Sequence, residues 1–533
     1  MGDGGFGAAD TFKEITLTMK SHLLFSLLLM NGLMPALAEQ SPGSMLATVL
    51  SADRQAWQVE PILTVGDQVG DYVFPGVPDG MGILLSDDAI HADIFINHEM
   101  REKQGHAYQL KNGTQLNGAR ISALRVNRQS ARPVSAGLAY DAIVDRLGRP
   151  VTSAAQVNER NHPSAGLSRL CSARLVESGS LGFVDDIYLT GEETDTMDSH
   201  GRGGSIWALD PGSRKLWAAP LLGRGAWENV TPVAPAAPGE IALLLGDDKP
   251  GAPLYLYRGT KQADGNFLAR NGLAAGRLYC WRADNGATSP ADFHGTGRKL
   301  SGSFVPVLVS DATKAGKRGF DSQGFLDSSR MRAGALRSGC FGFSRPEDLH
   351  NAPEDPGKIV FSSTGHAGLF SSDVWGTLYI LQVDTAKLTA SLRILYDGDD
   401  KGHRDEGIRS PDNLTWSDDG FVYVQEDNAI GTGAFGNNGM EASIWQIDPA
   451  GGEPARIAIV DRSVVLPRGS HDKYAGKLGA WETSGIIDVS RAFSRKPDET
   501  VLLVNVQAHG IQDGNIGGKQ GLVQSGQLLL LRH

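Results

Sequence analysis

Pairs of acidic residues recur directly after short apolar segments, and this pattern could bind metal ions. In the segment DIYLTGEETD (186–195), residues typical of a buried strand lead within two positions to Glu192 and Glu193. One such ending would be a solvated turn. Equivalent polar endings occur at Asn97-His98-Glu99, Asp247-Asp248, Thr364-Gly365-His366, Glu426-Asp427 and Gln507-Ala508-His509. The recurrence favours a shared site over separate surface turns.

The chemistry of these endings suits divalent or trivalent cations. Carboxylates that converge on one place repel one another, which raises their pKa values unless cations lie between them. Oxygen atoms of Asp, Glu and Asn are the ligands that Ca²⁺ prefers. The histidines at some of the endings add nitrogen atoms, which suit iron or manganese. We therefore predict a site that binds Ca²⁺, with Fe³⁺ or another transition metal as a further candidate.

Six repeated pairs of short β-strands would have to position these residues. The first strand of each pair is apolar with a polar ending, and the second often contains Tyr or Trp. The pairs are 93–100 with 119–127, 186–195 with 204–212, 241–251 with 252–259, 358–368 with 376–384, 421–429 with 442–452, and 501–510 with 526–533. Such self-similarity predicts an all-β fold, a six-bladed β-propeller. A two-domain β-sandwich is the competing fold.

In a propeller we expect the first strand of each pair to line the central channel, so that the polar endings meet at one mouth. The units average roughly 80 residues, whereas a compact blade has ~40–50. We therefore expect long insertions between strands, for example at 128–180 and 262–340.

Composition excludes some classes of partner. The 533 residues carry a net charge of −11, which disfavours nucleic acid and anionic membrane surfaces as general partners. Hydrophobic residues make up 41% of the chain, enough for a substantial core. The apolar run in the N-terminal region is too short to span a bilayer, and no later segment has 18 uninterrupted apolar residues. We expect no stable membrane insertion, a small-molecule substrate and a monomer.

The N-terminal region has the pattern of a targeting segment. Lys20 is followed by the apolar run 23–30 and by the small-residue site Ala36-Leu37-Ala38, directly before Glu39. This is typical of a secretory signal peptide that starts at Met19. We predict that residues 1–38 are an upstream extension plus signal peptide, that 39–533 are a single domain, and that the protein is periplasmic or secreted.

The three cysteines, Cys171, Cys280 and Cys340, are too few and too widely spaced for a disulfide framework or a zinc motif. We expect all three to be buried and unreactive. One disulfide with one remaining thiol is the alternative.

Further segments carry a family resemblance. They are FPGVPDGMGIL (74–84), GRGAWENVTP (223–232), GFSRPEDLH (342–350), SPDNLTW (410–416) and GAWETSGIIDVS (479–490). Together with the strand endings, and in this order, they resemble the PhoX family of bacterial alkaline phosphatases. The resemblance runs from about residue 60 to the last residue. It implies a six-bladed propeller, exported to the periplasm, that hydrolyses phosphate monoesters with calcium and iron in its channel.

The resemblance also implies roles for single residues. Arg345 stands where the family has a phosphate-binding arginine. The metal carboxylates that it implies are Glu192, Glu193, Glu228, Asp248 and Glu347. The strand endings add Glu99, Asp247, Glu426 and Asp427 to the predicted metal ligands, and the segment SPDNLTW adds Asp412. The predicted catalytic residues are Arg345, Glu347, Asn97 and His98.

The segment SRPED suits phosphate chemistry. A guanidinium such as that of Arg345 can donate two parallel hydrogen bonds to phosphoryl oxygens. Pro346 restricts the chain, so Glu347 can hold a metal on the same side of an extended segment. The alternative is a surface Arg–Glu pair beside a turn.

Two departures from the family pattern leave a second function open. The family has a cysteine that ligates iron at the position of Gly191, and nothing in the sequence establishes Cys171, twenty residues earlier, as its replacement. Trp227 stands where the family tends to have histidine. The alternative function is therefore a calcium-stabilised propeller that hydrolyses lactones or esters, or that binds a ligand without catalysis. Motifs of serine hydrolases, zinc proteases and P-loop enzymes do not occur in the sequence.

Overall fold

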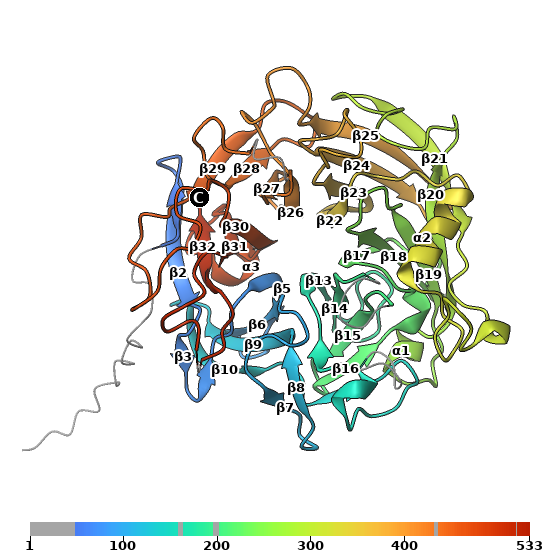
Figure 1. Ribbon diagram of the computed structural model, residues 1–533, viewed down its shortest axis with the longest axis horizontal. Coiled ribbons are helices and arrows are strands. Elements are labelled where there is room, and N and C mark those ends of the chain that lie inside the picture. The colour runs from blue at the N-terminus through green and yellow to red at the C-terminus, as the bar shows by residue number, and fades with distance from the viewer. Residues whose placement is uncertain (1–47, 158–163, 196–201, 431–434, 519) are drawn as a thin grey trace, which may run out of the picture. The chain divides into compact units, whose positions relative to one another are not determined.

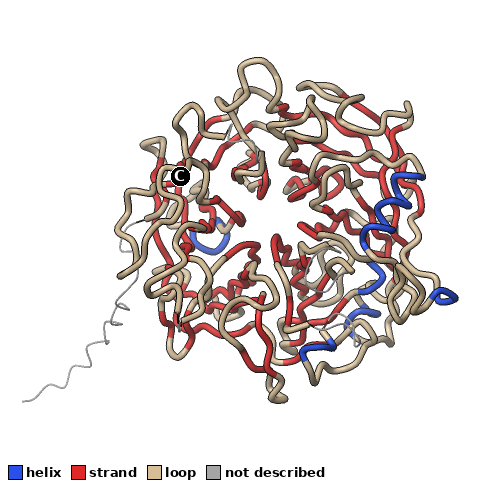
Figure 2. The backbone as a smooth tube through the Cα atoms, in the orientation of Figure 1, coloured by secondary structure: helices blue, strands red, loops and turns tan. Residues whose placement is uncertain are grey.

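The computed structural model describes residues 48–157, 164–195, 202–430, 435–518 and 520–533. Most of their regular structure is β-strand, and the sheets stand around a common centre (Figures 1 and 2). The predicted all-β propeller is confirmed. The expected leader, 1–38, lies outside the described residues, and the predicted domain boundaries stay a prediction.

Four of the sheets contain four or five strands, whose order runs from the centre outwards. The first contains β5 (Pro78–Leu85), β6 (His91–His98), β9 (Arg120–Asn127) and β10 (Arg132–Leu138). The second contains β13 (Leu170–Val176), β14 (Ile187–Glu192), β15 (Ile206–Asp210), β16 (Lys215–Ala218) and β11 (Ala142–Val144). Another contains β26 (Pro411–Trp416), β27 (Val422–Glu426), β28 (Ser443–Ile447), β29 (Ala455–Val460) and β1 (Leu50–Ala52). The last contains β30 (Glu482–Asp488), β31 (Val501–Ala508), β32 (Ser525–Arg532) and β2 (Gln58–Thr64).

A nine-stranded sheet lies between the second of these and the third. It contains β17 (Trp227–Val233), β18 (Glu240–Asp247), β19 (Tyr255–Thr260), β20 (Gly276–Ala283), β21 (Lys299–Pro306), β25 (Thr389–Asp397), β24 (Thr377–Asp384), β23 (Asp355–Ser363) and β22 (Pro346–Ala352). Pairing of β21 with β25 joins what would otherwise be two separate sheets. The number of six blades therefore stays a prediction.

The smaller elements lie in the connections. They are the pair β3 (Gln68–Val69) and β4 (Tyr72–Val73), the sheet of β7 (Tyr108–Gln109), β8 (Gln115–Gly118) and β12 (Gly166–Leu167), and the helices α1 (Phe267–Arg270), α2 (Ser328–Arg337) and α3 (Ser490–Phe493). The segments 128–180 and 262–340, which we expected to be insertions between strands, contain β10, β11 and β13 and the pair β20–β21, respectively. That expectation is wrong for these parts, because the strands belong to the main sheets.

The strands nearest the centre are not the ones that the sequence pattern predicts there. The innermost strands are β5, β13, β17, β22, β26 and β30, and each contacts the next to form a closed ring (Figure 1). The apolar strands with polar endings are β6, β14, β18, β23, β27 and β31, which are second in their sheets. The prediction that they line the channel is wrong. Because neighbouring strands are antiparallel, however, the end of each second strand lies beside the start of an innermost strand.

The first and last parts of the described chain close the ring. The strand β2 pairs with β32, from Gln58 opposite Arg532 to Thr64 opposite Gln527. Gln527 Nε2 donates a hydrogen bond to Thr64 Oγ1 at 3.0 Å, across 463 positions of sequence. The leucines of β32 are fully buried against this sheet, so the closure also removes apolar surface from water.

A disulfide joins Cys280 in β20 to Cys340, which follows α2. After α2 the chain runs back along β20, where Phe341 N donates to Trp281 O at 3.0 Å, and this brings the two sulfur atoms together. The expectation of three unpaired cysteines is wrong, and the alternative of one disulfide with one thiol holds. Cys171 is the free cysteine, and it is buried.

Replacing Cys280 and Cys340 together by serine should lower the free energy of unfolding by about 2–5 kcal/mol, because the unfolded chain loses a cross-link that spans 60 positions. Urea denaturation at a fixed metal concentration measures the change. A reducing agent should lower the melting temperature of the wild type and leave that of the double variant unchanged. Equal melting temperatures of the wild type with and without reductant would contradict the cross-link.

Candidate metal and phosphate site

The start of every innermost strand has the same irregularity. Relative to the second strand, each innermost strand carries one extra residue, between Pro78 and Met81, Leu170 and Ala173, Trp227 and Val230, Pro346 and Leu349, Pro411 and Leu414, and Ser484 and Ile486. Such β-bulges redirect side chains and are common beside active sites. Five of the six bulges contain an acidic or thiol side chain, namely Asp79, Cys171, Glu228, Glu347 and Asp412.

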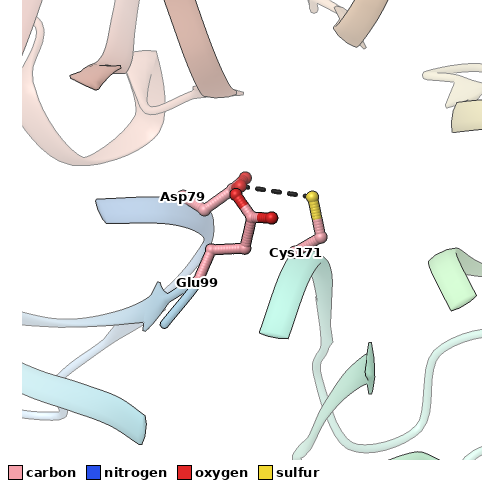
Figure 3. A group of neighbouring side chains, drawn as sticks. All are labelled: Asp79, Glu99 and Cys171. Carbon is pink, nitrogen blue, oxygen red and sulfur yellow. Dashed lines mark hydrogen bonds between the residues drawn. The ribbon is translucent and has the colours of Figure 1, made fainter. Parts of the chain in front are cut away.

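These five side chains and two carboxylates from second-strand endings form three overlapping groups. The groups are Asp79–Glu99–Cys171, Cys171–Glu193–Glu228 and Glu228–Glu347–Asp412, and in each the potential ligand atoms lie within 4.8 Å of one another. Cys171 and Glu228 each belong to two groups, so the seven residues are continuous. We call them the central cluster. In Figure 3, Asp79 and Glu99 face the Cys171 thiol, whose Sγ lies 3.2 Å from Asp79 Oδ2.

Burial and mutual repulsion make ionisation of several of these groups unfavourable. Burial, with the nearby charges of other carboxylates, raises the pKa of Asp79, Glu193, Glu347 and Asp412 well above the ordinary value. Burial likewise raises the pKa of Glu228 to about 8, and the charges of neighbouring aspartates add to the effect. A cation among these oxygen atoms would remove the penalty.

The donor set fits metal ions. Oxygen atoms from six carboxylates suit Ca²⁺, and the thiolate of Cys171 would suit a transition metal. Asp79 Oδ1 is buried and, among the described residues, has no hydrogen-bond partner. Buried carboxylate oxygens are usually bonded, so this atom is free to coordinate an ion.

Two arginines border the central cluster. Arg345 donates from Nε and Nη2 to the two oxygens of Asp248, at 2.6 and 2.7 Å, and its Nη2 lies 3.4 Å from Glu347 Oε1. Burial opposes ionisation of Asp248, but the charge and hydrogen bonds of Arg345 outweigh it and hold the pKa of Asp248 below its ordinary value. Arg169 Nη2 lies 2.6 Å from Glu99 Oε1 and is also hydrogen bonded to Glu193.

Some predicted site residues have side chains that bond within or beside their own sheets. Glu192 accepts from the backbone N–H groups of Ser168 and Ser205, at 2.9 and 3.2 Å. The other side chains of this kind are Asp247, bonded to Arg332 and Ala226 N, Glu426, bonded to Arg409 and Trp445, and His98, bonded to Ser122. Successive residues of a strand point to opposite faces, which separates each of these from its neighbour in the acidic pair.

The remaining predicted residues lie close to the central cluster without belonging to the three groups. Asn97 Nδ2 donates to the backbone carbonyl of Cys171 and to Thr190 Oγ1, so Asn97 supports the strand that carries the thiol. Asp427 is buried, and burial with the charge of Glu482 raises its pKa to about 7.

Three residues of the site, Asp79, Cys171 and Arg169, were not predicted from the sequence. The sequence does contain a signal for Asp79. Three innermost strands begin with a proline, an acid and a small or polar residue, namely Pro78-Asp79-Gly80, Pro346-Glu347-Asp348 and Pro411-Asp412-Asn413. Cys171 and Arg169 depart from this pattern, so only the three-dimensional equivalence of the bulges identifies them.

The position of Gly191 is explained by packing. A Cβ atom there would lie 2.4 Å from Trp227 Cβ and 2.6 Å from Trp227 O, so a larger residue does not fit beside Trp227. The free thiol of this chain instead lies at Cys171, between two groups of carboxylates.

Solved structures of other proteins share the fold. The structure of Pseudomonas fluorescens PhoX in complex with vanadate, a transition state analogue, matches with a TM-score of 0.58 and 18% identity, over 92% of this chain and 97% of that chain. At this identity the match shows the fold alone. A GH43 β-1,3-galactosidase (TM-score 0.33, 10% identity, 88% of this chain and 94% of that one) and a PL25 ulvan lyase (TM-score 0.34, 10% identity, 84% and 94%) are too dissimilar to carry an argument.

The amino-acid sequence matches one known family. No curated protein matches it. The family described as alkaline phosphatase PhoX matches residues 195–510, which is more than half of the chain. This confirms the resemblance inferred from the motifs, and with it the prediction of a metal-dependent phosphatase. The chain belongs to the alkaline phosphatase PhoX family.

Proposed function

We propose that this protein is an exported phosphatase that hydrolyses phosphate monoesters at the central cluster. The observation that carries the proposal is the continuity of the cluster. Cys171 links the first group of potential metal ligands to the second, and Glu228 links the second to the third. Two guanidiniums border these groups. Metals alone would suit many reactions, but guanidiniums beside them favour a substrate with an anionic phosphoryl group.

The residues that would hold metals divide by donor type. Glu228, Glu347 and Asp412 offer only oxygen atoms, which favours Ca²⁺ in their group. The two groups that contain Cys171 also offer sulfur, which favours Fe³⁺ or another transition metal. Bound metals supply charge neutralisation for the phosphoryl oxygens and lower the pKa of a bound water.

The chain's own residues would orient the substrate and the ligands. Arg345 is proposed to donate hydrogen bonds to non-bridging phosphoryl oxygens, and Pro346 holds it at a fixed offset from Glu347. Thr364 Oγ1 bonds to Glu347 Oε1 at 2.5 Å, and Ser172 Oγ bonds to Glu228 Oε1 at 2.7 Å. Such supporting hydrogen bonds restrict the rotation of carboxylate ligands and keep the site preorganised.

Export is supported by the disulfide between Cys280 and Cys340, because disulfides persist in oxidising compartments. The predicted signal peptide agrees with this localisation in the periplasm or outside the cell. Within the described ranges, no helix has the length and apolar character needed to cross a membrane.

Removing cations with a strong chelator should lower the melting temperature, because buried carboxylates would then face one another without compensation. Adding Ca²⁺ should restore it, and one site at about 100 times its Kd would contribute about 2.7 kcal/mol. Calorimetric melting with elemental analysis measures stability and metal content together. A melting temperature that does not respond to chelation would contradict a metal-filled cluster.

Substitutions at Arg345 and Glu347 should separate substrate binding from metal assembly. Arg345→Lys keeps the charge but loses the guanidinium, whose Nε and Nη2 hold Asp248 while its other N–H groups remain for the substrate, so kcat/KM for a phosphate monoester should fall by roughly 10–100-fold at unchanged metal content. Glu347→Gln should lower metal content and activity together, because it removes a charged ligand. Metal-loaded protein that opens lactones or esters but cleaves no phosphate monoester would refute the phosphatase assignment and support the alternative hydrolase.

Protein recovered from the periplasm or the medium of its host should begin at Glu39, because the small-residue site ends at Ala38. N-terminal sequencing tests this. Cytoplasmic protein that still begins at Met1 or Met19 would show that the segment is not a cleaved signal.

A further inference from the structure

Arg169 and Arg345 occupy the same place in the repeat. Arg169 directly precedes β13, and Arg345 directly precedes β22. In both cases the residue two positions later, Cys171 or Glu347, lies in the bulge and belongs to the central cluster. The repeat thus has a second arginine at the position where the first one is proposed to bind phosphate.

One carboxylate contact is also equivalent in the two arginines, and a second differs in its position. Each bonds to a carboxylate that follows the second strand of the preceding unit, Glu99 after β6 for Arg169 and Asp248 after β18 for Arg345. Each has a further carboxylate of its own unit nearby, Glu193 for Arg169 and Glu347 for Arg345.

These pairs form one continuous arc. Asp248 lies near Glu193, because its charge contributes to the raised pKa of Glu193, so the order of groups along the arc is carboxylate, guanidinium, two carboxylates, guanidinium, carboxylate. The two guanidiniums therefore lie along one edge of the central cluster.

The backbone holds Arg169 rigidly. Its N–H donates to Met100 O at 2.8 Å, and its carbonyl accepts from Glu193 N at 2.7 Å. Its φ of 48° is left-handed, but Val77 and Ser410 at the equivalent position of other units have φ values of 54° and 42°. The conformation therefore recurs at three of the six equivalent positions, although Arg345 does not share it.

Arg169 retains donors that the carboxylates do not use. A guanidinium has five N–H donors, and both carboxylate contacts of Arg169 involve Nη2. Its Nε is buried and has no partner among the described residues. The side chain is 28% exposed, compared with 20% for Arg345, so both reach the open side of the cluster.

We infer that Arg169 is a second phosphate-contacting residue, which acts with Arg345 to select dianionic phosphate monoesters over diesters. The inference rests on the proposed function. A monoester has three non-bridging oxygens and two charges, whereas a diester has two such oxygens and one charge. Two guanidiniums along one edge match the dianion, and a single guanidinium discriminates less.

The test uses the metal-loaded, full-length protein with Arg169→Gln and Arg169→Lys. The Kd for inorganic phosphate, measured by calorimetry, should rise by roughly 10–100-fold in Arg169→Gln, because a charged hydrogen-bond donor is lost. It should rise less in Arg169→Lys, which keeps the charge. Metal content by elemental analysis should stay unchanged, and the ratio of kcat/KM for monoesters to that for diesters should fall in both variants.

Arg258→Gln is the matched control. Arg258 pairs with Glu240 at 2.7 Å and is 23% exposed, so its substitution removes a comparable ion pair and the same charge, at the end of β18 away from Asp247. Phosphate affinity, metal content and the monoester-to-diester ratio should equal those of the wild type.

Two results would overturn the inference while the proposed function stands. The first is an unchanged phosphate Kd in Arg169→Gln when the wild type binds phosphate and cleaves monoesters. The second is loss of metal in both variants, which would make Arg169 a clamp for Glu99 and Glu193 only. A metal-loaded wild type that neither binds phosphate nor cleaves monoesters would refute the proposed function, and the inference with it.

Discussion

Repulsion among buried carboxylates is the constraint on which the rest of this structure depends. Six acids and a thiol share the centre of the propeller, and burial makes their simultaneous ionisation unfavourable. Two guanidiniums neutralise part of this charge at one edge of the cluster. The remaining carboxylates and the thiol require bound cations to balance their charge. The β-bulges serve the same end, because they turn one acid or thiol of nearly every innermost strand toward the centre.

The acidic pairs at the second-strand endings divide two tasks between adjacent residues. Glu193 and Asp248 face the arginines, whereas Glu192 and Asp247 bond to backbone N–H groups of their own sheets. One member of each pair thus completes the hydrogen bonding of a strand end, and the other contributes to the site. In the first unit His98 takes the strand-end position beside Glu99, so a carboxylate is one of the side chains that can fill it.

Much of the fold could be predicted from the sequence, because the second strands are apolar and end in acids. The innermost strands could not be recognised in the same way. Their starts, such as Pro78-Asp79-Gly80, are polar although buried, because their side chains serve the cluster instead of the core. In the sequence these polar starts resemble loops. For this reason the sequence pattern predicts the second strands, and not the innermost ones, as the lining of the channel. The place of Cys171 in the cluster and the disulfide between Cys280 and Cys340 depend on contacts between distant segments. The spacing of cysteines in the sequence does not reveal such contacts.

The pairing of β2 with β32 has a consequence for how the site comes into being. The groups of the cluster belong to four of the five large sheets, and the ring that holds them closes only when segments 463 positions apart meet in the fifth. Contacts so distant in sequence slow folding, because the loop-closure entropy of a long segment opposes them. An ion bound in the cluster therefore stabilises the closed ring by mass action. Metal affinity and closure are thermodynamically linked, so a weakening of the β2–β32 seam, far from the centre, would appear as weaker metal binding.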